Sequence, residues 1–256
     1  MSSIRNGARS PLTARSLIAS LLLGLDPPRA TAQFVVRSNE MFGVTEGTTR
    51  TALSRMVTAH ELAAADGSYE LIGELRARKS RQALSRSAER RSWDRTWTLA
   101  VVAPGARTPR DRAAFREAGR RLRLVEWREG LWCRPDNLDA DRLADSRAVL
   151  AAQSTWVTGA IPDAPPVDLF AAGAWAADAE RLIAEMTRLE PALSSADREA
   201  LERGFLLSAD VIRHFGSDPL LPDELVDDWP GDALRRSFDR HEVVFKRAHR
   251  SWFKVT

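Results

Sequence analysis

The Asp66-Gly67 dipeptide constrains the fold of this chain more than any other local feature. It separates two short runs, residues 61–64 and residues 69–72. Asp-Gly between two such runs is the strongest short-range signal for a β-hairpin. Three helical patterns precede the hairpin, and that order predicts a winged helix-turn-helix over residues 1–75.

Each of the three segments ahead of the hairpin has the pattern of a short helix. Thr13 and Thr45 are good N-cap residues, because their hydroxyls can accept a hydrogen bond from the first helical turn. Gly24 ends the first segment, and Glu46 suits the positive end of the third helix dipole. We predict helices over residues 13–23, 31–41 and about 45–59.

The third predicted helix has the two faces that a helix needs in the major groove of DNA. One stripe of apolar residues packs inward, and the outer residues carry hydrogen-bond donors for phosphates and base edges. An ordinary three-helix unit with a polar outer face is the structural alternative. The candidate DNA-binding residues are Thr45, Thr48, Thr49, Arg50, Ser54 and Arg55 on the helix, with Ser68 and Tyr69 on the hairpin.

Residues 76–92 form a basic linker without a wide apolar stripe. The pattern fits a helical linker or an extension of the hairpin. Its cations either lie near DNA phosphates or form a solvated face, and the residues leave both possibilities open.

The rest of the chain divides into two further predicted domains, residues 93–165 and residues 166–256. The first has the order β-α-β-β-α-β, which is the ferredoxin-like pattern. Its strands are expected at residues 97–102, 124–127, 131–134 and 154–158, and its helices at residues 109–122 and 138–150. Helices of the second are expected at residues 168–189, 196–215 and 232–252. The chain as a whole is therefore predicted to be α+β, with a helical C-terminal domain.

Charge is distributed unevenly along the chain. Residues 1–95 contain 15 Lys and Arg against 9 Asp and Glu, whereas residues 168–256 contain 12 against 17. The excess of positive charge in residues 1–95 favours a polyanion such as DNA as the partner of this segment. Only 3 of the 38 cations are lysine, so a general preference for arginine is the alternative explanation.

Cys133 is the only cysteine, which excludes an intramolecular disulfide and fits a reducing cytoplasm. The apolar run of residues 17–25 is too short to span a bilayer and is followed by Asp26-Pro27-Pro28 rather than a cleavage site. We therefore expect a cytoplasmic protein without a membrane partner.

The second half also has side chains that suit a small effector. Tryptophans can line an aromatic or acyl pocket, and arginines can bind an anionic group. Core packing and salt bridges are the alternative roles. The candidate effector-binding residues are Trp132, Arg134, Arg213, His214 and Trp229. Because no P-loop, dinucleotide-binding glycine pattern, GxSxG or metal-ligand spacing is present, we expect no cofactor, no metal and no catalytic residue.

Seven stretches, in order along nearly the whole chain, resemble the PaaX-like regulators, the repressors of phenylacetate catabolism. They are residues 13–18, 42–57, 93–97, 128–135, 213–215, 218–225 and 228–231. The hairpin departs from the family, because Ala-rich sequence replaces its usual basic residues; Arg76 and Arg78 are candidates for that role.

The resemblance implies a homodimeric repressor of a catabolic operon that an aryl- or acyl-CoA effector releases from its operator. It also implies a central domain related to a nuclease that holds a metal with an acid after its first strand. Residues 102–105 contain no carboxylate, which favours a noncatalytic dimerisation module. A metal-dependent nuclease and a protein-interaction module that binds no DNA are the alternative functions.

Overall fold

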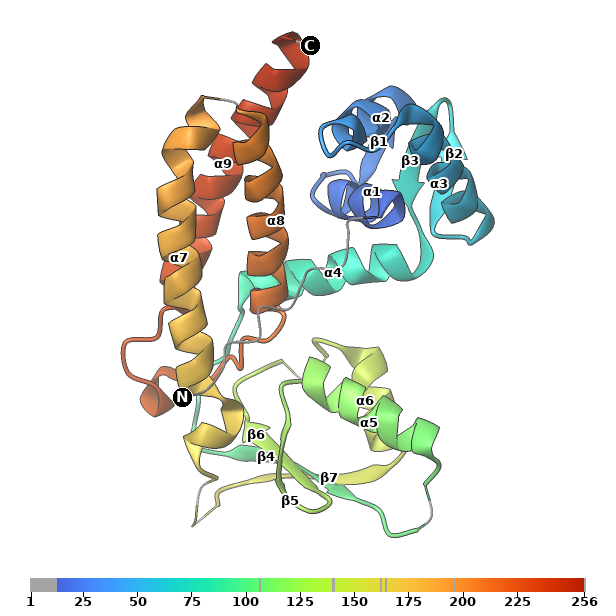
Figure 1. Ribbon diagram of the computed structural model, residues 1–256. Helices are drawn as coiled ribbons and strands as arrows, with labels where there is room; N and C mark the ends of the chain where they lie inside the picture. The colour runs from blue at the N-terminus through green and yellow to red at the C-terminus, as the bar shows by residue number, and fades with distance from the viewer. Residues whose placement is uncertain are drawn as a thin grey trace, which may run out of the picture. The chain divides into compact units, whose positions relative to one another are not determined.

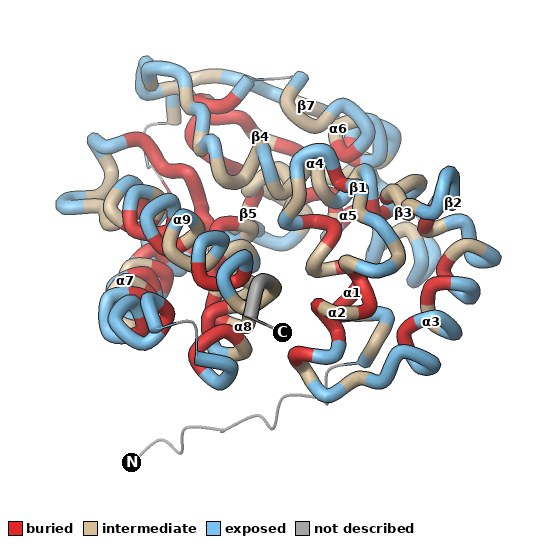
Figure 2. Tube along the Cα trace, turned by 90° about the horizontal axis from the view of Figure 1, so that it is seen from above, coloured by how far each residue is buried: buried red, intermediate tan, exposed pale blue. Residues whose placement is uncertain are grey.

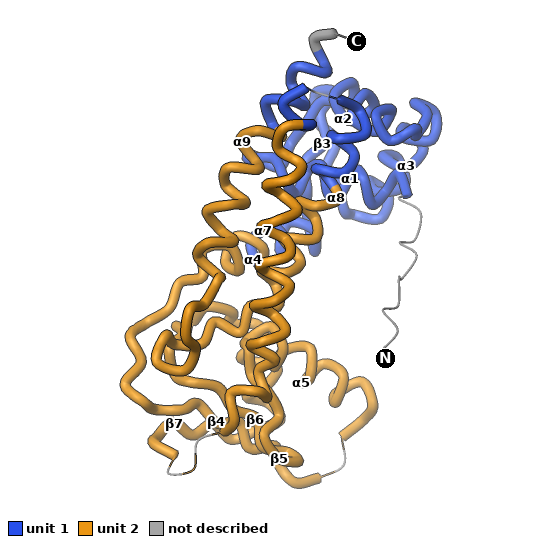
Figure 3. Tube along the Cα trace, turned by 60° about the vertical axis from the view of Figure 1, so that its left-hand side comes forward, with its two compact units in different colours: residues 1–81, 192–205, 246–256 blue, residues 82–191, 206–245 orange. Residues whose placement is uncertain are grey.

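The computed structural model describes residues 13–105, 107–139, 141–161, 163, 165–195 and 197–255. Residues 1–12 of the first predicted domain and Pro162 of the proline-rich linker lie outside the described residues. The fold is mixed α and β, as predicted, and the described chain forms two antiparallel sheets. It divides into two compact units (Figure 3): residues 1–81, 192–205 and 246–256 are unit 1, and residues 82–191 and 206–245 are unit 2. The predicted domain limits stay predictions.

Unit 1 contains the three predicted helices and the predicted hairpin (Figure 1). Thr13, Thr31 and Thr45 are the N-caps of the three helices, and each side chain accepts a hydrogen bond from the backbone N–H three residues later. The elements are α1 (Ala14–Leu23), β1 (Arg29–Thr31), α2 (Ala32–Glu40), α3 (Glu46–Thr58), β2 (Leu62–Ala65), β3 (Ser68–Leu71) and the first part of α4 (Gly73–Ser87).

The turn of the hairpin has the geometry that Asp-Gly favours. Asp66 has φ +50° and Gly67 has φ +70°, the positive values that a type I′ turn requires at both central residues. Strand β1 is not among the predicted elements. It pairs antiparallel with β3 and makes the sheet order β1-β3-β2; three residues are too few to show an alternating pattern.

The core of unit 1 orients α3. Ile18 and Leu22 of α1 and Val35 of α2 are buried with Leu53 and Met56 of α3. Burying one such side chain contributes roughly 1.5–3 kcal/mol, so together they fix which face of α3 points outward. Figure 2 shows the resulting alternation of buried and exposed residues along α3.

Short pieces of the C-terminal helices also belong to unit 1. The ring centroids of Phe42 and Phe205 lie 4.9 Å apart, and those of Phe34 and Phe253 lie 5.3 Å apart in a stacked pair. His249 is buried beside Phe34. Burial lowers the pKa of His249 to about 4.

Unit 2 contains the predicted β-α-β-β-α-β order. Its four strands pair antiparallel in the order β5-β6-β4-β7, and α5 and α6 cover one face of this sheet (Figure 1). The elements are β4 (Trp97–Val102), α5 (Pro109–Arg121), β5 (Val125–Arg128), β6 (Leu131–Pro135), α6 (Ala144–Ala151) and β7 (Ser154–Gly159).

Helix α6 begins later than predicted. Residues 138–139 and 141–143 are not helical because their backbone is engaged elsewhere: Arg91 donates to the Leu138 carbonyl, and the Asp139 side chain accepts from the Asp141 N–H in a turn. The C-terminal elements are the 3₁₀ turn η1 (Val167–Phe170), α7 (Ala172–Ser194), α8 (Arg198–Phe215), the 3₁₀ turn η2 (Asp223–Leu225) and α9 (Gly231–Val255). Among the described residues, no helix has the length and apolar character needed to cross a membrane.

Candidate nucleic-acid interface

The outer face of α3 carries two arginines, of which one is ion-paired and the other is not. Arg50 donates from Nε to Oε1 of Glu46 at 2.7 Å, and both side chains are more than half exposed. Arg55 is exposed and makes no hydrogen bond or ion pair with the part of the chain that the structure describes. Arg55 is therefore the cation of α3 that is free to bind an external anion.

The two arginines lie on different sides of the exposed surface of α3. Five residues at 3.6 residues per turn separate them by about 140° around the helix axis. Thr51 and Ser54 are exposed between them. One arginine can therefore face base edges while the other faces a phosphate backbone.

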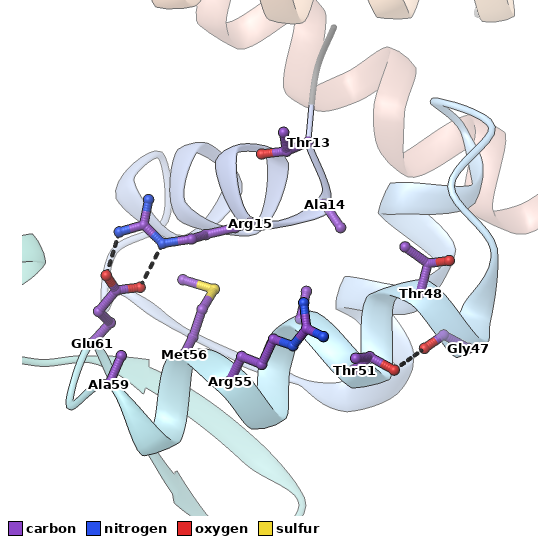
Figure 4. A pocket seen from close by; sticks show the side chains of 11 residues that line it. Thr13, Ala14, Arg15, Gly47, Thr48, Thr51, Arg55, Met56, Ala59 and Glu61 are labelled. Atoms are coloured by element: carbon purple, nitrogen blue, oxygen red, sulfur yellow. Dashed lines mark hydrogen bonds and ion pairs between the residues drawn. The ribbon is translucent and has the colours of Figure 1, made fainter.

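A cavity of about 530 Å³ lies between the start of α1 and the Arg55 side of α3. Thr13 and Arg15 line it from α1, and Gly47, Thr51 and Arg55 line it from α3. Figure 4 shows the Arg55 side chain between the two helices and Arg15 turned toward Glu61. The cavity thus combines guanidinium groups, hydroxyl groups and the first turn of a helix.

Arg15 is held in place by a two-point ion pair. Its Nε donates to Oε2 of Glu61 at 2.9 Å, and its Nη2 donates to Oε1 of the same carboxylate. These hydrogen bonds raise the pKa of Arg15. Since the Arg15 side chain is 60% exposed against 21% for Glu61, the guanidinium remains accessible beside the cavity.

The threonines at the start of α3 differ in whether their hydroxyl groups can donate a hydrogen bond to a ligand. Thr51 donates its hydroxyl to the Gly47 carbonyl at 2.9 Å, so that proton is already used. Thr45 accepts from the Thr48 N–H, and the two hydroxyl oxygens are 2.9 Å apart. One hydroxyl hydrogen of this pair bridges the two oxygens, which leaves the other available as a donor to a phosphate.

Thr49 does not fit its predicted role as a DNA contact. Its side chain is completely buried, and its hydroxyl oxygen accepts a hydrogen bond from Nδ2 of Asn39 at 3.2 Å. Thr49 therefore joins α2 to α3 inside unit 1. Polarity alone could not separate it from Thr48, because the helical position decides which of the two points outward.

The hairpin residues lie closer to the core than expected. Ser68 and Tyr69 are half-buried, and Tyr69 packs against the core of unit 1. Arg76 forms an ion pair with Glu70, with Nη1 and Oε1 3.0 Å apart. Among the described residues of the hairpin strands, the exposed positions of β2 are alanines, so the hairpin offers little positive charge.

Two of the predicted effector residues are part of the framework of unit 2. Arg134 is 5% exposed and donates to the carbonyls of Leu122, Pro135 and Leu220 and to Oδ1 of Asn137. Burial lowers the pKa of Arg134 to about 9. Protein acceptors thus already surround the Arg134 guanidinium, and its binding of an effector anion stays a prediction.

Trp132 is partly buried and packs beneath α5. A Cβ on Gly119 would lie 3.1 Å from the Trp132 ring, and the Phe115 ring meets Trp132 edge-on with centroids 5.6 Å apart. The absence of a side chain at Gly119 is what admits the indole. Core packing, the alternative role of this tryptophan, is the one observed.

The other three predicted effector residues lie around one aromatic stack. Trp175 stacks against His214 at 4.4 Å and against Trp229 at 4.6 Å between ring centroids. Trp175 Nε1 donates to the His214 carbonyl, and burial lowers the pKa of His214. Arg213 is exposed and paired with Asp210. Of the predicted effector residues, His214 and Trp229 are thus brought together, through a residue that was not predicted.

Sequence analysis also missed Arg15, Gly47 and Thr51 as residues of the α3 surface. Arg15 is far from α3 along the chain, and only the packing of α1 on α3 brings them together. Across the described chain, no group of three or more His, Cys, Asp or Glu residues could hold a metal ion.

Comparisons with known proteins match this chain to a family model and to solved structures. The family model described as PaaX-like protein C-terminal domain matches residues 171–254. The solved structure titled "Uncharacterized protein Rv0674 from Mycobacterium tuberculosis" is 34% identical, with 93% of this chain and 98% of that chain covered and a TM-score of 0.73. No curated protein matches.

Proposed function

Since this chain belongs to the PaaX-like family, we propose that it is a sequence-specific DNA-binding transcriptional regulator. The observation that carries the proposal is the outer face of α3, where Arg55 has no partner among the described residues and stands beside a cavity. An exposed helix with an unpaired guanidinium and a hollow next to it is suited to a duplex, which presents base edges next to rows of phosphates.

Residues 13–71 support a winged helix-turn-helix as the DNA-binding fold. Helices α1 to α3 precede an antiparallel sheet whose β2–β3 hairpin has a type I′ turn. In this proposal α3 enters the major groove, and Arg50 or Arg55 reads a guanine. The weak charge of the hairpin means that α1 and α3 supply most of the phosphate contacts.

We assign one backbone phosphate to the cavity between α1 and α3. Arg55 provides positive charge there, Arg15 lies beside it in its ion pair with Glu61, and the Thr45–Thr48 pair provides a hydroxyl donor. Gly47 lines the same cavity with nothing within 4 Å of the position that a Cβ would occupy. A glycine at this position allows a phosphate to approach the first turn of α3 closely, where the helix dipole favours an anion.

The central sheet fits a ferredoxin-like module that dimerises and does not catalyse. Its strand order β5-β6-β4-β7 with α5 and α6 on one face supports that fold. The residues after β4 contain no carboxylate, so a nuclease site is not part of the proposal. A homodimer would present two copies of α3 to two half-sites of a pseudo-palindromic operator.

A small-molecule effector, an aryl- or acyl-CoA as the family resemblance implies, is proposed to release the operator. The surroundings of the Trp175 stack are the candidate region, because His214 and Trp229 meet there and Arg213 is exposed next to them. A repressor of a catabolic operon acts on the chromosome, and a cytoplasmic location is part of the proposal.

The test is a binding titration with labelled duplex from the region upstream of the protein's own reading frame. We expect this duplex to bind more tightly than a scrambled duplex of the same length, and the logarithm of the affinity to fall linearly with the logarithm of the salt concentration. Equal affinity for both duplexes, or no binding at low salt, would contradict the proposal. Cleavage of the duplex with magnesium or manganese would instead favour the nuclease.

A further inference from the structure

Strand β7 is an outer strand of the central sheet, and one of its two edges is open. All six of its residues pair with β4, from Ser154 opposite Val102 to Gly159 opposite Trp97. No other strand of the described chain pairs with β7. The N–H and C=O groups on its second edge therefore point away from the sheet, in the arrangement that another strand can extend.

Nothing in the sequence of β7 protects this edge. Its residues are Ser-Thr-Trp-Val-Thr-Gly, with no charge and no proline, and its pairing with β4 has no irregularity. The opposite edge of the same sheet differs. Strand β5 carries Glu126 and Arg128, and its pairing shifts between these two residues. A charged, irregular edge discourages a further strand, whereas a regular uncharged edge of six residues accepts one.

Exposed valines lie near β7 on both sides of the sheet, and on the helix-covered face Arg147 of α6 also lies over the Trp156 ring, 4.5 Å from its centroid. Val157 is 48% exposed, and Val101 on the neighbouring strand is 42% exposed on the same face. On the helix-covered face, Val149 of α6 is 37% exposed. A strand pair alone engages fewer residues than the roughly 20–30 per side of a stable interface. These valines are the means by which a contact along β7 extends beyond the strand.

We propose that β7 pairs antiparallel with β7 of a second copy of this chain, so that two four-stranded sheets become one continuous sheet. A second copy is the occupant that fits, because two-fold symmetry brings identical edges together. Strand β7 carries no charged side chain, so no like charges face each other between the two paired strands. The inference rests on the dimer in the proposed function and names the surface that forms it.

The first test measures the oligomeric state of the full chain by sedimentation equilibrium. We expect a dimer, and we expect Val157→Lys to weaken it at least tenfold or make it monomeric, because two ammonium groups then meet near the axis. Val243→Lys is the matched control, since Val243 on α9 is 61% exposed. Thermal melting of each variant checks that it is folded.

A second test does not depend on introducing a charge. Cys133 is fully buried, and burial raises the pKa of its thiol to about 12, so the native cysteine does not react. A Val157→Cys variant should form covalent dimers with a short bismaleimide, and Val243→Cys should not.

The outcomes separate this inference from the proposed function. A dimer that keeps its affinity in Val157→Lys and does not cross-link through residue 157 overturns the β7 interface and leaves the regulator intact. A monomeric wild type overturns both the interface and the dimeric operator complex. Specific DNA binding by the wild type in either case shows that the failure concerns assembly and not DNA recognition.

Discussion

Arg55 on α3 and Arg134 on β6 have the same side chain and opposite surroundings. Arg55 is exposed and has no partner among the described residues, whereas Arg134 is 5% exposed and donates to three carbonyls and to the amide of Asn137. A guanidinium has five donors and no acceptor. It either binds acceptors of its own chain or remains available to acceptors from outside.

Two other arginines of unit 2 also bind acceptors of their own chain, at the C-terminal end of α4. Arg142 and Arg235 donate to carbonyls of the last turn of α4, Leu84 and Ser85 among them. Carbonyls of the last helical turn lack a backbone N–H partner within the helix, although the Ser87 hydroxyl also donates to the Leu84 carbonyl. Positive charge is favoured at this end of the helix dipole. These arginines thus stabilise unit 2, whereas the exposed Arg55 of α3 remains available to bind an external acceptor.

Replacing Arg134 is expected to give the largest effect. Arg134→Leu removes a buried guanidinium and leaves the Asn137 amide oxygen and the Leu122 carbonyl without this donor, whereas the Leu220 carbonyl still accepts from Nδ2 of Asn137. Unsatisfied buried polar groups cost about 1–3 kcal/mol each, so we expect the free energy of unfolding to fall by about 3–5 kcal/mol. Urea denaturation followed by circular dichroism measures it. A loss below about 1 kcal/mol would show that these acceptors find other donors.

Arg55→Ala should weaken operator binding and leave stability nearly unchanged. A base or phosphate contact of this kind is worth about 1–3 kcal/mol, which is a loss of roughly 5- to 150-fold in operator affinity. We expect stability to change by less than about 0.5 kcal/mol, because Arg55 is exposed. If Arg55 contacts a phosphate, the salt dependence also decreases by about one unit of slope.

Arg50→Ala is the matched control for Arg55. Arg50 forms an ion pair with Glu46, so part of its positive charge is already compensated. We expect a smaller loss of affinity than for Arg55. If Arg50→Ala weakens operator binding more than Arg55→Ala, the base-reading side of α3 is the Arg50 side and the contrast between the two arginines is misassigned.

The sequence predicts elements well where a local signal determines them. Threonine caps, the Asp66-Gly67 turn and short apolar runs such as β4 depend on neighbouring residues, and the structure contains them. Partners distant in the chain are different. That Arg134 meets the Leu220 carbonyl depends on tertiary packing, and no pattern near residue 134 indicates it. The same limit applies to Arg15 beside α3.

Thr49→Val tests the contrast between burial and exposure within one helix. Valine has nearly the same shape but leaves Nδ2 of Asn39 without its acceptor. We expect the free energy of unfolding to fall by about 1–2 kcal/mol, with operator affinity of the folded protein unchanged. Thr48→Val, one residue away and exposed, should alter stability little and weaken DNA binding. Reduced affinity in folded Thr49→Val would restore Thr49 as a DNA contact.

Gly47→Ala is expected to change stability and operator affinity in opposite directions. Glycine costs about 0.5–1 kcal/mol relative to alanine inside a helix, and a Cβ at residue 47 meets nothing within 4 Å. The variant should therefore be more stable by about that amount. The added methyl also enters the cavity between α1 and α3, so a phosphate there must move away, and we expect affinity to fall by up to about tenfold, or 1.4 kcal/mol.

These opposite signs make Gly47 informative, because a change of fold would move stability and affinity in the same direction. Thermal melting and the operator titration measure the two quantities on the same sample. Higher stability with unchanged affinity would mean that no phosphate approaches the first turn of α3. The free guanidinium of Arg55 would then have to meet DNA farther along the helix, away from the cavity that Arg15 lines.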